Sequence, residues 1–199
     1  HGCTYVQRHY AEPCKSRAYI GTNLTDFIRK RFDSRAPVRV GIIPYSTPAN
    51  LAPGRGGDTP SFGSQIAWKL HQELIATGEV PVLEVFNRED WPGKKDEFFT
   101  GNFGALSFAR QAGYDVVIVG YLEPQTNLEM MSAATKVLEV ESGITLYYSK
   151  ETVTTNRKTY DSGLNSIWLK DVRPSDLYFP EMTEALTRCI VRGIHRADE

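Results

Sequence analysis

Apolar and polar residues alternate along residues 136–155, and this alternation is the clearest structural signal in the chain. The apolar positions share one face if the turn is a three-residue loop over residues 141–143. Such a loop needs a left-handed residue at its last position, which Gly143 supplies. The pattern therefore predicts a β-hairpin with one buried face. The predicted cross-strand pairs are Val140 with Ile144 and Leu138 with Leu146.

Other apolar runs predict a mixed sheet with helices packed on it. Three strands are expected at residues 38–45, 80–86 and 115–122, and the last of these is the most apolar and should be central. Helical periodicity predicts helices from Pro60 to Gly78, from 103 to 112 and from 180 to 195. Residues 38–199 are thus predicted to form one α+β domain, a three-layer-like α/β arrangement with the order β-α-β-α-β-β-β-α.

Residues 1–37 precede this domain and are predicted to form a leader with a short amphipathic helix. Thr22 or Asn23 can cap the helix, and its apolar face includes Phe27 and Phe32. That face must be covered either by the domain itself or by a neighbouring subunit, so both phenylalanines are candidate interface residues.

Trp168 lies in an irregular, aromatic stretch between residues 156 and 180. Two interpretations are equally consistent with its surroundings. It is either a partly buried loop residue or an aromatic contact at a membrane or subunit interface, where tryptophan is favoured.

Composition narrows the class of protein. The chain has 199 residues, a hydrophobic share of 41% and a net charge of −1, which argues against a nucleic-acid footprint over the whole surface. Residues 1–35 contain seven Lys or Arg and three acids, a net +4, so the remainder carries −5.

No run approaches the ~20 apolar residues of a membrane-spanning helix. The chain also begins without the pattern of an export signal, which we expect to have been removed.

The three cysteines do not have the spacing of metal ligands. Cys3 follows Gly2, as in processed bacterial lipoproteins, so Cys3 is the expected site of a covalent lipid; the alternative is an ordinary terminal cysteine. Cys189 lies in the apolar stripe of the last helix. It is expected as a buried free thiol, and a disulfide with Cys14 is the alternative hypothesis.

No motif in the sequence predicts catalysis, a metal or a cofactor. The loop Gly54–Asp58 lies where phosphate-binding loops occur, but it lacks the P-loop Lys-Ser/Thr pair and is better interpreted as a flexible loop. His71 is expected on the solvated side of its helix. The acids Glu84, Glu139 and Glu141 are expected on the outward faces of strands.

Three short stretches, in this order, carry a family resemblance: LEVFNRED at 83–90, DVVIVG at 115–120 and VLEVESG at 137–143. Together with the closing helix they resemble the curli-secretion lipoprotein (CsgG-like) family. That family includes the Pel polysaccharide-export lipoprotein, and its fold is related to the amino-terminal domain of TolB. Ser142 stands where the family usually has threonine.

The resemblance implies a Gram-negative outer-membrane lipoprotein that faces the periplasm. Its expected partners are further copies in a homo-oligomeric ring, the membrane reached through the lipid, and other envelope or export proteins. It implies a scaffold for secretion or polysaccharide export and no enzyme activity. The connections at 123–132 and 156–180 look too short or too polar for transmembrane hairpins.

Two rival functions stay open. One is a monomeric envelope lipoprotein that docks on and activates an envelope enzyme or machine. The other is a nucleotide- or sugar-binding enzyme that uses the Gly54–Asp58 loop.

Overall fold

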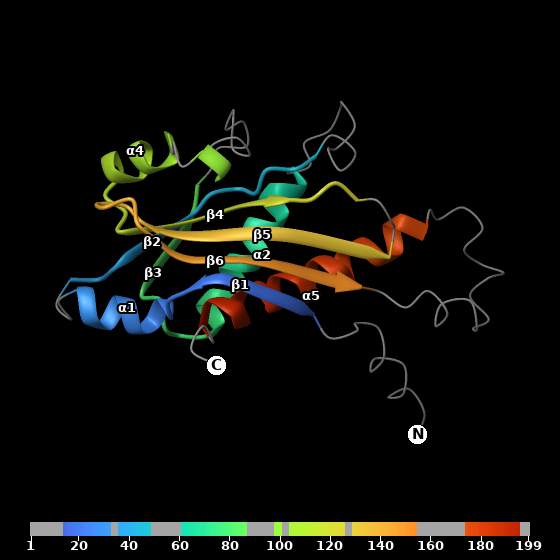
Figure 1. The fold of residues 1–199 in the computed structure, drawn as a ribbon, viewed down its shortest axis with the longest axis horizontal. Coiled ribbons are helices and arrows are strands. Elements are labelled where there is room, and N and C mark those ends of the chain that lie inside the picture. The colour runs from blue at the N-terminus through green and yellow to red at the C-terminus, as the bar shows by residue number, and fades with distance from the viewer. Residues whose placement is uncertain are drawn as a thin grey trace, which may run out of the picture.

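A computed structural model describes residues 14–32, 36–48, 61–86, 98–100, 104–125, 129–154 and 174–195. These residues build a mixed six-stranded sheet with the spatial order β1-β6-β5-β4-β2-β3 (Figure 1). The strands are β1 (Lys15–Gly21), β2 (Arg39–Ile42), β3 (Val82–Val85), β4 (Val116–Leu122), β5 (Met130–Glu139) and β6 (Thr145–Thr154). The helices are α1 (Leu24–Arg31), α2 (Phe62–Ala76), α4 (Gly104–Gln111) and α5 (Pro174–His195).

From β2 onward the elements follow the predicted order β-α-β-α-β-β-β-α, which is therefore confirmed. Strands β3, β2 and β4 are parallel, as expected where helices connect them, and β4, β5, β6 and β1 are antiparallel. All seven residues of β4 are buried, so the most apolar strand is indeed central. Helix α5 begins at Pro174, earlier than the predicted Pro180, and proline is tolerated in a first helical turn.

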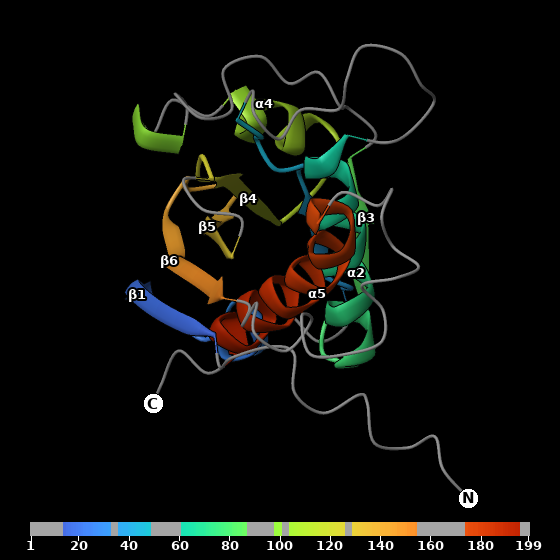
Figure 2. The same ribbon diagram turned by 90° about the vertical axis from the view of Figure 1, so that its right-hand side faces the viewer.

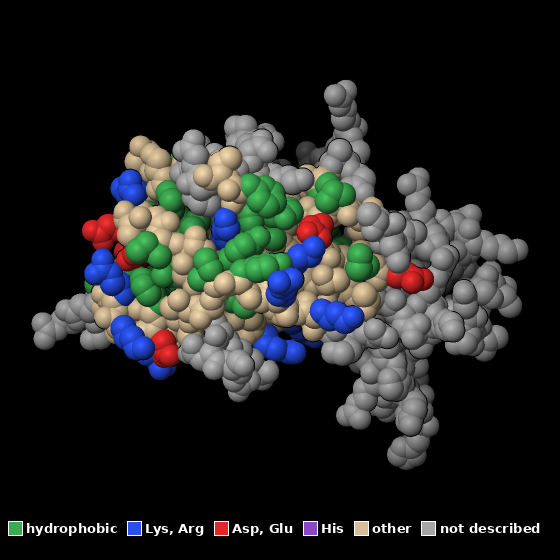
Figure 3. Space-filling view, viewed as in Figure 1, with side chains coloured by type: hydrophobic (Ala, Val, Ile, Leu, Met, Phe, Trp, Pro, Cys, Tyr) green, Lys and Arg blue, Asp and Glu red, His purple; other side chains and the backbone are tan. Residues whose placement is uncertain are grey.

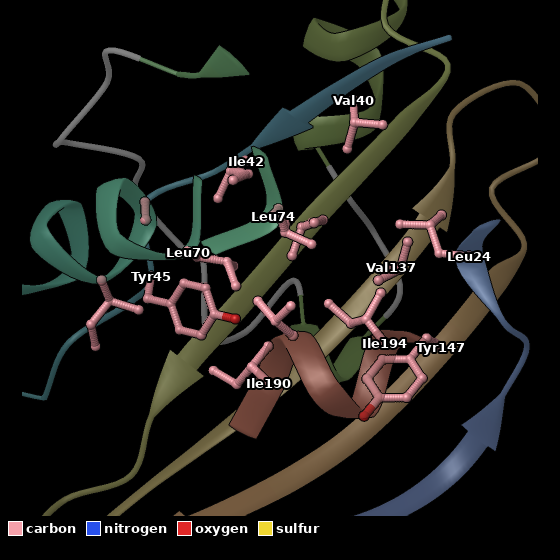
Figure 4. Packing of buried hydrophobic residues seen from close by; sticks show 14 of the residues in the cluster. Leu24, Val40, Ile42, Tyr45, Leu70, Leu74, Val137, Tyr147, Ile190 and Ile194 are labelled. Atoms are coloured by element: carbon pink, nitrogen blue, oxygen red, sulfur yellow. The ribbon is translucent and has the colours of Figure 1, made fainter. Parts of the chain in front are cut away.

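Helices cover both faces of the sheet. Figure 2 shows α2 and α5 together on one side and α4 on the other. The larger core lies under α2 and α5, where Leu70 and Leu74 of α2 meet Ile190 and Ile194 of α5 (Figure 4). A smaller core lies under α4 and includes Ala105 and Ala109 of that helix, together with apolar residues of β4 and β5. The arrangement is the three-layer-like α/β fold.

Strand β1 is a finding that the hydrophobic pattern did not indicate. It pairs antiparallel with β6 and forms one edge of the sheet, with β3 at the other edge. All seven of its residues are exposed, so its sequence KSRAYIG shows no alternation of buried and polar positions. This part of the predicted leader therefore belongs to the sheet.

Helix α1 follows directly and covers its own domain. The side chain of Asn23 accepts a hydrogen bond from the Asp26 backbone N–H at 3.2 Å, so Asn23 is the cap. Leu24 and Ile28 are buried in the larger core, and Phe27 and Phe32 pack against it from outside. The sequence allowed the apolar face of this helix to be covered either by the domain itself or by a neighbouring subunit. In the structure, the described contacts of this face are with the domain.

The hairpin between β5 and β6 differs from the prediction in its register. The Glu139 N–H donates to the Ile144 carbonyl at 3.0 Å, so the loop has four residues, Val140–Gly143, and Leu138 lies opposite Thr145. The predicted left-handed backbone at Gly143 is confirmed by its φ of 72°. The expectation of one buried face is wrong for β5, whose residues are buried on both sides.

Strand β5 is buried on both faces because helices cover both sides of the sheet there, whereas β6 alternates between buried and partly exposed positions. The register shifts after Leu138, and Val137 then lies opposite Tyr147, which leaves Leu146 as an extra residue. Leu138 therefore joins the core under α4, whereas Leu146 joins the core under α2 and α5.

Candidate interaction surface

Five aromatic rings form a continuous cluster on the α4 side of the sheet. Tyr19 of β1 stacks on Tyr148 of β6, with ring centroids 4.8 Å apart. Phe98 lies 5.6 Å from Tyr148 and 5.0 Å from Tyr121 of β4, and Phe99 lies 5.2 Å from Tyr121. We call these five residues the aromatic surface. The spacing of the rings is typical of favourable aromatic pairs.

Cations are interleaved with these rings. The ammonium of Lys136 lies 4.4 Å from the centre of the Phe98 ring and 5.1 Å from that of Tyr148, and it donates a 2.5 Å hydrogen bond to the Phe98 carbonyl. The Arg17 guanidinium lies 5.0 Å from the centre of the Tyr19 ring. Such contacts hold a cation over the negative ring face. Burial lowers the pKa of Lys136.

The central ring of the aromatic surface is buried, and the rings at its two ends are exposed to solvent. Phe98 is buried, whereas Tyr19 is 47% exposed and Phe99 is 58% exposed. In Figure 3 the corresponding face carries a band of apolar side chains with basic side chains among and beside them. Exposed aromatic and apolar groups gathered on one face are characteristic of a binding surface rather than of scattered surface residues.

The sequence placed Tyr148 in the predicted hairpin and Tyr121 in the predicted strand 115–122, but it indicated no common surface for the five rings. The rings come from separate segments, and only the sheet order β1-β6-β5-β4 brings them together. The position of β1 was the missing information, because Tyr19 reaches the cluster through the pairing of β1 with β6.

A disulfide fixes the beginning of β1. Cys14 is bonded to Cys189 of α5, and their Cα atoms are 6.0 Å apart. The sequence favoured a free thiol at Cys189 because a bridge required the leader to cross the last helix. Pairing of β1 with β6 makes that crossing, since it places the start of β1 beside α5.

A buried carboxyl group lies on the opposite side of the sheet from the aromatic surface. Glu151 of β6 is 0% exposed. Its Oε1 accepts hydrogen bonds from Tyr147 Oη at 3.1 Å, from Ser16 Oγ at 3.5 Å and from Ser149 Oγ, whereas its Oε2 has no hydrogen-bond partner. Burial raises the pKa of Glu151 to about 7. The signal for this group was available, since position 151 shares a strand face with Tyr147 and Val153.

Glu139 corrects another expectation. Its predicted place on an outward strand face is wrong, because it is only 5% exposed. Arg31 of α1 lies across from it, with 3.0 Å between Nε and Oε1. A hydrogen bond from Ser142, reinforced by Arg31, lowers the pKa of Glu139. Glu84 and Glu141 are exposed, as expected.

Thr25, His195 and Glu79 bring a hydroxyl, an imidazole and a carboxylate together, but not in a catalytic order. Glu79 Oε2 lies 2.5 Å from Thr25 Oγ1 and 2.9 Å from His195 Nδ1. Thr25 Oγ1 also lies 3.3 Å from the same Nδ1, and Nε2 is buried without a partner. A hydrolytic triad uses opposite ring nitrogens for the nucleophile and the acid. The cluster instead links α1 to the end of α5.

His71 is half-buried rather than solvated, since its Nε2 lies 3.1 Å from the Leu83 carbonyl. Cys3, Trp168 and the Gly54–Asp58 loop lie outside the described residues. A shallow pocket of about 370 Å³ borders α1 and is lined by residues 21–23 and by Asp26, Phe27, Lys30 and Arg31 of that helix.

Within the described ranges, no group of three or more His, Cys, Asp or Glu residues could hold a metal ion. Over the same ranges, no helix has both the length and the apolar character needed to cross a bilayer.

Comparisons with known proteins agree with the architecture. No protein-family model and no curated protein matches the chain. The fold is similar to that of the PelC dodecamer from Paraburkholderia phytofirmans, with a TM-score of 0.50 and 15% identity over 92% of this chain and 97% of that one. At this identity the similarity shows a shared fold.

Two further solved structures are more distant. The hypothetical protein CT253 from Chlamydia trachomatis matches with a TM-score of 0.44 and 12% identity, over 79% of this chain and 98% of that one. TolB from Acinetobacter baumannii matches with a TM-score of 0.37 and 12% identity, over 72% of this chain and 27% of that one.

Proposed function

We propose that this protein is a subunit of a ring on the periplasmic face of a Gram-negative outer membrane, anchored by a lipid on Cys3. The ring would support export of a polymer, such as a polysaccharide, or assembly of an envelope machine, without catalysing a reaction. The observation that carries the proposal is the exposed aromatic surface beside the unpaired edge of β1. An apolar, aromatic face next to an open strand is suited to contact with another protein chain.

Two further points support this proposal. The similar PelC structure is described as a dodecamer, and it shares the architecture over almost the whole chain. The sequence stretches at 83–90, 115–120 and 137–143 independently suggest membership of the curli-secretion lipoprotein family. Both the family membership and the lipid on Cys3 are parts of the proposal.

The same surface also favours a second candidate, a monomer that docks on and activates an envelope enzyme or machine. Strand β1 carries Lys15 and Arg17 and no acid. Basic side chains on an edge strand disfavour pairing with a second copy of the same edge. A partner with acidic residues around an apolar centre would be accepted equally well, and a ring would have to pair β1 with a different surface of the next subunit.

Native mass spectrometry of a Cys3→Ser form, without lipid or detergent, separates these two functions. The ring predicts a closed oligomer of a single size. A clean monomer across micromolar concentrations would contradict the ring and favour the docking protein. A nucleotide or sugar phosphate that remained bound in the same spectra would argue for the Gly54–Asp58 enzyme instead.

Charge substitutions test whether the aromatic surface makes the contact. Tyr19→Asp and Phe99→Asp should each shift the oligomer to smaller species, because a charge would then have to be buried between subunits. Gln72→Asp is the matched control, since it places the same charge on an exposed position of α2, on the other side of the sheet. Unchanged oligomers in both aromatic variants, or equal loss in the control, would contradict this assignment.

A further inference from the structure

Glu151 is a carboxyl group buried beside the larger core. Its neighbours supply hydroxyl groups that donate hydrogen bonds to it, but no positively charged side chain in the described part of the chain pairs with it. Ser149 and Tyr147 donate from its own strand, and Ser16 donates from β1. On α5, Gly193 lies close to it, since an added Cβ there would be 3.5 Å from Oε1. Because Oε2 is buried without a partner, ionisation would leave a negative charge with half of its hydrogen-bonding capacity unused.

Basic side chains near Glu151 in the sequence face away from it. Lys150 and Arg17 are direct cross-strand partners, so they lie on the aromatic side of the sheet, and Lys15 is two residues from Arg17 on the same side. On α5, Arg188 pairs with Glu73 and Glu184, and Arg192 is exposed.

The other titratable neighbours of Glu151 are phenols. Burial raises the pKa of both Tyr147 and Tyr45, so they stay neutral and offer no counter-charge. Among the described residues, no ion pair joins Glu151 to a cation.

Strand β1 is the cover of Glu151 that can move most easily. It is an edge strand, it pairs only with β6, and none of its residues is buried. Its pairing is already irregular between Ala18 and Ile20. By contrast, α5 carries core residues such as Leu186 and Ile190, so moving it would open the larger core. Segments with few buried contacts open at the lowest free-energy cost.

We propose that Glu151 is a proton-operated latch for strand β1. With the carboxyl group neutral, β1 stays closed over it, because covering a neutral group does not bury a charge. With the carboxylate ionised, the structure gains by letting water reach Oε2, and β1 between Ser16 and Gly21 loosens from β6. Tyr19 lies in this segment, so opening separates Tyr19 from Tyr148 and dismantles one end of the aromatic surface. The effect on subunit contacts rests on the proposed function, whereas the latch itself does not.

The pH range and the limit of the motion follow from two other features. Burial raises the pKa of Glu151 to about 7 in the closed form, so the latch operates around neutral pH. The Cys14–Cys189 disulfide lies just before β1 and holds its start against α5. The motion is therefore a hinged opening from a fixed point in the oxidised protein, and reduction would extend it.

Amide hydrogen exchange of the oxidised Cys3→Ser protein at pH 5 to 8 tests the latch. After correction for intrinsic exchange, protection of residues 16–21 should fall by about tenfold or more between pH 5 and pH 8, because the open form ionises at the ordinary carboxyl pKa. The buried strand β4 is the internal control and should keep its protection. Glu151→Gln cannot ionise, and it should abolish the pH dependence in β1 while leaving β4 unchanged.

Unchanged protection of β1 across this range, or an equal pH dependence in Glu151→Gln, would overturn the proposal. If Glu151→Gln fails to fold, ¹³C NMR of the Glu151 carboxyl group in the parent protein decides instead. Its titration midpoint must then coincide with that of β1 opening, and separate midpoints would exclude the latch.

Exchange reports on β1 in a monomer and in a ring alike, whereas native mass spectrometry at pH 5 reports on the ring alone. Failure of the latch and failure of the ring are thus seen separately.

Discussion

Arg31 of α1 and Glu139 at the end of β5 form an ion pair of unequal burial, with 3.0 Å between Nε and Oε1. The carboxylate is buried and the guanidinium is half exposed, so the arginine closes the site from outside. The pair therefore ties the helix that follows β1 to the central hairpin. Ser142 donates to the other carboxylate oxygen, so Glu139 is well satisfied as an anion.

Arg31→Ala is expected to destabilise the fold by more than a control substitution does, because it leaves the buried Glu139 carboxylate with one partner fewer. Arg29→Ala removes the same charge from an exposed position of the same helix and should change stability by less than about 0.5 kcal/mol. Urea unfolding of both variants measures the difference. Equal effects would mean that the pair with Glu139 contributes nothing specific.

The disulfide is expected to be a large contributor to stability. It joins residues separated by 175 positions in the sequence, and closing so long a loop stabilises by about 3–5 kcal/mol in the chain-entropy model. The double variant Cys14→Ser, Cys189→Ser should therefore lose about that much, and dithiothreitol should then have no further effect on it. Non-reducing peptide mapping provides the direct check, because two alkylatable thiols at these positions would contradict the bridge.

Glu151→Gln is expected to change how stability depends on pH. The pKa of Glu151 in the folded protein is about 7, above its ordinary value, so the folded state binds the extra proton between these two values. The contribution of Glu151 to stability is complete at low pH and declines as pH rises through about 7. At pH 8 the glutamine variant should thus gain about 2–3 kcal/mol relative to the parent, compared with their difference at pH 4. Thermal unfolding at both pH values measures this, and parallel profiles would contradict it.

Gly193→Ala should destabilise the protein although alanine is the better helix former. An added Cβ would collide with the Tyr147 hydroxyl, which leaves no space between α5 and β6 at this point. Overpacking of this kind costs about 1–3 kcal/mol. In a Tyr147→Phe background the hydroxyl is absent, so the same glycine substitution should cost at least about 1 kcal/mol less. A double-mutant cycle by urea unfolding gives this coupling, and additive effects would exclude the close contact.

The sequence was sufficient for the elements whose faces are buried. The strand at 115–122, the α2 stripe and the left-handed Gly143 all follow from local patterns, and the order of elements follows from them. Register was harder to predict, because the alternation in β5 and β6 assumes that one face is solvated. Here helices cover both faces, so Leu138 and Leu146 are both buried although they point to opposite sides.

The candidate interaction surface could not be predicted in the same way. Strand β1 has no buried residue and thus no hydrophobic signal, yet it contributes both Tyr19 and the cover of Glu151. The bridge between Cys14 and Cys189 depends on the same strand. The aromatic surface, the cover of Glu151 and the disulfide therefore all depend on the position of β1, which is set by its long-range pairing with β6 and not by a local sequence pattern.

The pairing of β1 with β6 has a consequence for biosynthesis. Lys15 of β1 pairs with Thr152 of β6, so β1 cannot take its place in the sheet until β6 has been synthesised. Because synthesis begins at the amino-terminal end, β1 stays unpaired while the other strands of the sheet assemble. Contacts of such long sequence separation also form slowly. Until then the outer edge of β6 is open to other chains. Oxidation of Cys14 with Cys189 requires α5 as well, so it is expected to mark the completion of folding rather than its beginning.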